Sequence, residues 1–113
     1  MRVIIAGGRD NWNTQDVLTA IEESSFKISE VVCGEAPGVD TMGRRWAEWN
    51  GIAVASFPAD WDKYGKPAGP IRNGHMAMYG EALIAVWDGK SRGTKNMIQQ
   101  AEECDLHIHI HKV

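Results

Sequence analysis

The stretch from Glu81 to Ala101 most constrains the fold, because its hydrophobic pattern changes twice. Leu83–Trp87 is a continuous apolar run, typical of a parallel strand that is covered on both faces. The polar segment Asp88–Thr94 interrupts it with glycines and helix-capping residues. Apolar residues then recur at helical spacing from Met97 to Ala101. The stretch therefore predicts a strand, a turn and a helix, with unpaired backbone N–H groups where the helix begins.

The same order of strand, turn and helix occurs three times before this unit. Apolar runs at Arg2–Ala6, Val31–Cys33 and Ile52–Phe57 are each followed by a loop and an amphipathic segment. The last segment, Asp105–His111, alternates apolar residues with histidines, which predicts an edge strand with one face wetter than the other. This order predicts an α/β fold: one Rossmann-like domain over residues 1–113, with helices on both faces of a doubly wound, parallel five-stranded sheet of order 3-2-1-4-5.

Capping signals and glycines set the expected helix boundaries. Asn13 or Thr14 caps the first helix, and the second spans Val39–Asn50. Pro70 fits the first position of the third helix. The segment Pro58–Gly69 between the third strand and that helix is predicted to be an irregular loop, of a length that often has a function in small domains.

The composition narrows the class of protein. With 43% hydrophobic and 24% charged residues, the 113-residue chain is typical of a soluble globular domain. It has no apolar run of the roughly 20 residues that a membrane helix needs, and no signal-peptide pattern, so we expect a cytoplasmic protein and no membrane partner. The net charge of −3 disfavours a surface that coats nucleic acid. Basic residues nevertheless occur near the predicted helix starts, which favours a local anion site.

Two of the predicted turns have residues suited to ligand contact. Gly7-Gly8-Arg9-Asp10 lets a ligand approach the backbone, although it matches neither the dinucleotide fingerprint nor a P-loop, and a plain tight turn explains it equally. The helix predicted to follow Leu83–Trp87 begins with Ser91, Gly93 and Thr94. Their hydroxyl and N–H groups can bind phosphate or carboxylate oxygens without a metal, and they can also simply cap the helix.

Four further side chains are candidates for nucleotide contacts. Arg72 can pair with a phosphate as a bidentate fork. Asp40 and Asp88 can accept hydrogen bonds from ribose hydroxyls. Trp61 can stack on a base. Each residue also has a purely structural interpretation. The arginine can lie free at the surface, the two carboxylates can cap a helix or stabilise a turn, and the indole can pack against the protein.

Metal binding and nucleophilic catalysis are not predicted. His107, His109 and His111 share one strand face, but successive side chains on that face are about 6.5–7 Å apart, which is loose for a tetrahedral zinc site. No GxSxG elbow is present, and no Cys–His pairing is suggested. We therefore expect neither a resident metal nor a cofactor, and the sequence assigns no catalytic residue.

Four segments together resemble the YspA/YpsA-related branch of the SLOG superfamily, which groups the SMF/DprA DNA-processing proteins with the LOG cytokinin-activating proteins. These segments are VIIAGGRD, CGEAPGVDTMGRRWAEWNGI, PADWDKYGKPAGPIRNGHMA and ALIAVWDGKSRGTKNMIQQA. The resemblance implies a Rossmann-like domain that binds nucleotides or their derivatives, often as a homodimer. By position, it implies ligand contacts at Gly7, Gly8, Arg9, Asp10, Gly34, Gly38, Asp40, Arg72, Asn73, Asp88, Gly89, Ser91, Gly93 and Thr94.

One departure from the LOG pattern bears on the function. LOG enzymes cleave N-glycosidic bonds with a glutamate in PGGxGTxxE and an arginine. Here Gly93-Thr94 matches the GT, but Met97 stands at the glutamate position. The leading expectation is therefore binding or sensing of a nucleotide derivative, ADP-ribose-like or a signalling nucleotide. The alternatives are a phosphoribohydrolase-like N-glycosidase, with Asp40, Asp88 or Glu35 as the acid, and DprA-like nucleic-acid binding, which the charge balance disfavours.

Overall fold

A computed structural model describes all residues from Met1 to Val113. Its centre is a five-stranded sheet in the order β3-β2-β1-β4-β5, and every neighbouring pair is parallel. This topology confirms the doubly wound sheet expected from the sequence. The strands are β1 (Arg2–Gly7), β2 (Glu30–Cys33), β3 (Ala53–Ser56), β4 (Ala82–Trp87) and β5 (His107–Lys112).

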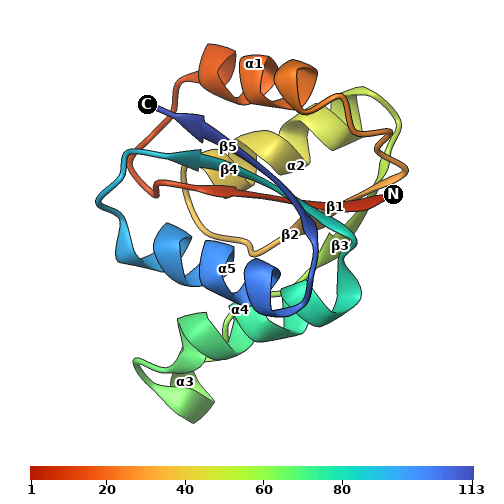
Figure 1. Cartoon of the computed structure of the whole chain (residues 1–113). Coiled ribbons are helices and arrows are strands. Elements are labelled where there is room, and N and C mark those ends of the chain that lie inside the picture. The colour runs from red at the N-terminus through yellow and green to blue at the C-terminus, as the bar shows by residue number, and fades with distance from the viewer.

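Helices cover both faces of the sheet (Figure 1). On one face lie α1 (Thr14–Ser24) and α2 (Val39–Trp49), and on the other lie α4 (Ala68–Tyr79) and α5 (Arg92–Glu103). The short helix α3 (Trp61–Tyr64) stands beyond the start of α4. None of these helices combines the length and apolar character needed to cross a membrane.

Alternate residues of the central strands supply two separate cores. Val3 and Ile5 of β1 pack with α1 and α2, whereas Ile4 and Ala6 pack with α4 and α5. Because successive side chains of a strand point to opposite faces, a strand buried on both faces is apolar throughout. Burying each large aliphatic side chain contributes about 1.5–3 kcal/mol, so the two cores hold the strand ends in fixed positions.

The prediction of an irregular loop at Pro58–Gly69 is wrong in part, because residues 61–64 form α3. The Asp60 side chain caps this turn, accepting a hydrogen bond from Lys63 N–H at 3.0 Å. Helix α4 also begins at Ala68, before Pro70. A proline is tolerated there because the first-turn N–H groups have no partner within the helix.

Strand β5 lies at the edge of the sheet as predicted, and its histidines differ in exposure: His107 is exposed, whereas His109 and His111 are partly buried. His109 Nε2 and His111 Nδ1 lie 3.3 Å and 2.8 Å from one oxygen of Glu23 in α1. Ile110, on the opposite face, is 42% exposed. Period-2 alternation identified the strand, and the contact with α1 leaves the side chains of His109 and His111 only 28% and 18% exposed.

Candidate functional site

The loops that follow the strands gather at the carboxyl edge of the sheet, on the left in Figure 1. There β1 leads to α1 on one face, while its neighbour β4 leads to α5 on the other face. Such a switch point is the usual ligand site of open α/β sheets. A cavity of about 600 Å³ opens at this edge, within the size range of small-molecule sites.

The structure divides the candidate residues between this first cavity and a second one of about 540 Å³ beside it. Candidates that line the first cavity are Gly7, Arg9, Gly34, Asp40, Trp61, Arg72, Asn73, Ser91, Gly93 and Thr94. Those that line the second are Gly8, Arg9, Asp10, Asp88 and Ser91.

Gly38 and Gly89 line neither cavity. Gly38 has φ +76°, and a Cβ there would lie 2.3 Å from the carbonyl oxygen of Gly8. Gly89 has φ +83°, and a Cβ there would meet Lys112 at 2.8 Å. Since only glycine tolerates such a conformation together with such a close approach, both residues shape the loops that surround the site.

Asp40 is the most unusual side chain of the first cavity. It lies in the first turn of α2 and is only 5% exposed. Burial raises the pKa of Asp40 to about 6, although the Arg72 guanidinium and the backbone N–H groups of Ala36 and Gly7 act in the opposite direction. No cation lies within ion-pair distance of its carboxylate, so this acid can exchange a proton near neutral pH.

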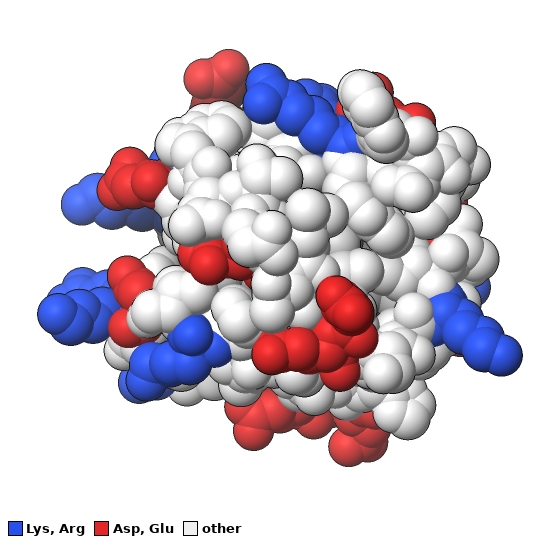
Figure 2. All heavy atoms as spheres, turned by 90° about the horizontal axis from the view of Figure 1, so that it is seen from above, with Lys and Arg blue, Asp and Glu red and all other residues white.

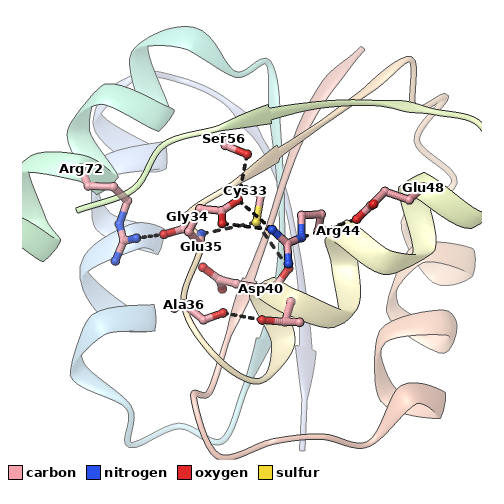
Figure 3. Close-up of polar contacts among 10 residues, drawn as sticks. Cys33, Gly34, Glu35, Ala36, Asp40, Arg44, Glu48, Ser56 and Arg72 are labelled. Carbon is pink, nitrogen blue, oxygen red and sulfur yellow. Dashed lines mark hydrogen bonds and ion pairs between the residues drawn. The ribbon is translucent and has the colours of Figure 1, made fainter. Parts of the chain in front are cut away.

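Arg72 faces the same cavity from α4 (Figure 3). Its Nη1 donates a hydrogen bond to the carbonyl of Gly34, and its Nε donates to Asn73 Oδ1 at 3.0 Å. Burial lowers the pKa of Arg72, and the nearby Asp40 acts against this shift. Asn73 in turn donates to Asn96 Oδ1 at 3.0 Å. These bonds fix the direction of the guanidinium and connect α4 to α5.

Gly34 separates the two charged side chains. A Cβ at this position would lie 2.7 Å from both Arg72 Nη1 and Asp40 Oδ2. Any larger residue would therefore force one of the two groups to move. The glycine allows a partly buried cation and a buried acid to flank the same loop.

The start of α5 lies on the same cavity. Ser91 occupies the N-cap position, but its side chain caps no backbone N–H. Instead, Ser91 Oγ lies 3.1 Å from Thr94 Oγ1. No neighbouring atom lies within 4 Å of where a Gly93 Cβ would stand. The first N–H groups of a 12-residue helix therefore face accessible space, an arrangement that favours anions.

Comparisons with known proteins show the family of the chain. A family model described as the YspA, cpYpsA-related SLOG family matches residues 1–64. The chain belongs to this family. It is also 31% identical over 117 residues to the Gene 61 protein of Mycobacterium phage D29, a match that covers 95% of this chain and 93% of that protein.

A solved structure extends the comparison to the fold of this SLOG domain. The X-ray structure of DNA processing protein A (DprA) from Streptococcus pneumoniae superposes with a TM-score of 0.74 at 18% sequence identity. The match covers 96% of this chain and 49% of the DprA chain, so the domain spans about half the length of that protein. At this identity the likeness shows a common fold.

One polar network of this SLOG domain was not predicted from the sequence. Glu35, at φ 63°, accepts hydrogen bonds from Arg44 Nη1 at 3.1 Å and from Ser56 Oγ at 2.8 Å (Figure 3). Glu35 lies in a loop and its two partners come from a helix and a strand, so no local spacing indicated them. Because Glu35 is already paired, it anchors the loop between β2 and α2.

The turn after β4 has a similar internal anchor. Asp88 Oδ1 accepts hydrogen bonds from the backbone N–H groups of Ser91 and Lys90, each at 2.8 Å. These two bonds lower the pKa of Asp88. The carboxylate therefore stays ionised and fixes the loop that leads into α5.

Two apolar side chains complete the first cavity. Trp61 is 51% exposed at its rim, and its ring packs over Gly69. Met97, at the position where LOG enzymes have their glutamate, is buried in the wall. Three acids were considered as replacements for that glutamate. Asp40 lines this cavity without an ion-pair partner, whereas Glu35 is paired with Arg44. Asp88 lines only the second cavity.

Proposed function

We propose that this SLOG domain binds or senses a nucleotide derivative in the first cavity. The observation that carries the proposal is that Arg72 and the open start of α5 face one cavity whose rim holds Trp61. A guanidinium and free helix N–H groups bind phosphate oxygens, and an indole stacks on a base. Membership of a SLOG family supports the same assignment.

The charge distribution supports a small ligand rather than a nucleic-acid strand. Figure 2 shows acidic and basic side chains interspersed, mostly at the margins, with a large uncharged area between them. A strand-coating surface usually carries a clear basic excess, whereas this chain has a net charge of −3. Single-stranded DNA remains the third arm of the test below, because DprA is named for DNA processing.

A second candidate function, hydrolysis of the bound nucleotide at its N-glycosidic bond, is favoured by Asp40. The residue is a buried acid whose pKa is raised to about 6, close to that of an efficient general acid at neutral pH. It would donate its proton to the leaving base as the glycosidic C–N bond breaks, and the water that adds to the sugar carbon would return a proton to the Asp40 carboxylate. Met97 argues against the glutamate-dependent version of this reaction.

One panel separates these functions. The protein is incubated with nucleoside monophosphates, NAD, ADP-ribose, cyclic signalling nucleotides and single-stranded DNA, and both the melting temperature and the products are recorded. A rise in melting temperature with intact ligand supports binding or sensing. Release of free base supports hydrolysis. If only DNA raises the melting temperature, both nucleotide functions are wrong.

A further inference from the structure

The second cavity adjoins the first, and Arg9 and Ser91 line both. In Figure 2, basic and acidic side chains both flank an indentation at the left margin, the side on which Figure 1 places the loops after β1 and β4. Each cavity alone falls within the size range of a small-molecule site. Two adjoining cavities with a common wall suit a ligand made of two parts.

The wall between the cavities is suited to phosphate. This wall lies at the ends of β1 and β4. The two strands are close there, because a Cβ on Gly7 would lie 2.4 Å from the carbonyl oxygen of Val86. No carboxylate lies within ion-pair distance of the Arg9 guanidinium. Ser91 adds the start of α5. A linker that crosses this wall therefore meets a cation without an ion-pair partner and a helix N-terminus.

The two cavities differ in chemistry. Trp61 lines the first, whereas no aromatic side chain lines the second. The second has instead the charged side chains of Asp10 and Lys90, neither of which forms an ion pair. A carboxylate accepts hydrogen bonds from sugar hydroxyls, and an ammonium group donates to hydroxyl or phosphate oxygens. The first cavity thus suits a base, and the second suits a sugar.

We propose that the ligand is a nucleoside diphosphate sugar that occupies both cavities. Its nucleoside lies in the first cavity, its diphosphate crosses Arg9 and Ser91, and its second sugar contacts Asp10 and Lys90. This inference rests on the proposed function and narrows it, since a mononucleotide would leave the second cavity empty and a dinucleotide would place a second base among charged side chains.

Titration calorimetry tests the proposal with ADP, ADP-ribose and NAD, and with UDP and GDP and one sugar conjugate of each. The best-bound conjugate is expected to bind at least about tenfold more tightly than its own diphosphate, a difference of about 1.4 kcal/mol. D10A and K90A are expected to abolish most of that gain while changing the affinity for the diphosphate less than about threefold. The controls E102A and K27A remove an exposed charge of the same sign outside both cavities.

The outcomes separate this inference from the proposed function. If each diphosphate binds as tightly as its conjugate, or if D10A and K90A weaken both alike, the second sugar site is wrong while nucleotide binding stands. If NAD binds more tightly than ADP-ribose, the second cavity accepts a base, and the inference is also wrong. If no diphosphate or conjugate binds, the proposed function fails together with the inference.

Discussion

At the scale of single residues, the account depends on a buried acid and a partly buried guanidinium that face one cavity. Arg72 is held by Gly34 and Asn73, whereas Asp40 has no ion-pair partner. The sequence indicated both residues by their position at predicted helix starts. It could not indicate the burial of Asp40, because that depends on how α2 and α4 meet across the loop after β2.

Replacing Asp40 is expected to change how stability depends on pH. Folding raises the pKa of Asp40 from 3.8 to about 6, so the native state binds more protons than the unfolded chain between these values. The contribution of Asp40 to the free energy of unfolding therefore falls as the pH rises through this window. The free energy of unfolding of D40N, measured relative to that of wild type, should therefore rise by about 2–3 kcal/mol from pH 4 to pH 7.

Urea unfolding at a series of pH values measures this difference. Working with the difference between D40N and wild type removes the contributions of carboxylates whose pKa is lowered, such as Glu23 and Glu81. If the free energies of unfolding of D40N and wild type differ by the same amount at pH 4 and at pH 7, Asp40 is not buried as an acid.

Replacing Arg72 is expected to weaken ligand binding more than folding. R72A removes charge-assisted hydrogen bonds, each of which contributes about 1.5–3 kcal/mol, so affinity should fall roughly tenfold to a hundredfold. T94A should give a smaller loss in the same direction. K66A, an exposed substitution outside both cavities, is the matched control. Unchanged affinity in both R72A and T94A would remove the phosphate site from the first cavity.

At the scale of elements, the sequence predicted most of what positions the site. The apolar runs identified five strands, and the turn residues placed four loops at one edge. The helix α3 was missed because its single turn depends on a local cap at Asp60 rather than on an apolar stripe. The contact of Glu23 with His109 and His111 was not predicted, because Glu23 is remote from both in sequence.

The loop between β2 and α2 should be sensitive to one methyl group. G34A would place a Cβ 2.7 Å from Arg72 Nη1 and Asp40 Oδ2, and so should displace at least one of them. We expect ligand affinity to fall by about tenfold or more. G74A is the control, because a Cβ there meets only ordinary contacts of 3.7 Å or longer. Wild-type affinity in G34A would mean that the two groups need not flank this loop.

At the scale of the whole molecule, the surface of α2 bears on the oligomeric state. Trp49 of α2 is 91% exposed at the surface. Tryptophan is enriched at protein–protein interfaces relative to the rest of the surface. The homodimer expected from the family resemblance therefore stays a prediction, with α2 as its proposed contact.

Light scattering coupled to gel filtration checks this prediction. Wild-type protein is expected to run as a dimer and W49S as a monomer that remains folded by circular dichroism. W12S, which replaces a half-exposed indole already stacked on Arg45, is the control. A wild-type protein that is monomeric at high concentration would contradict the dimer.

The central claim is that a nucleotide derivative binds at the carboxyl edge of the sheet. Amide correlation spectra of isotope-labelled protein, titrated with each nucleotide of the panel, test it most directly. The account predicts saturable shifts for at least one nucleotide, concentrated in Gly7–Asp10, Gly34–Asp40 and Ser91–Thr94. Shifts confined to α1 and β5, or no shift with any nucleotide, would contradict it.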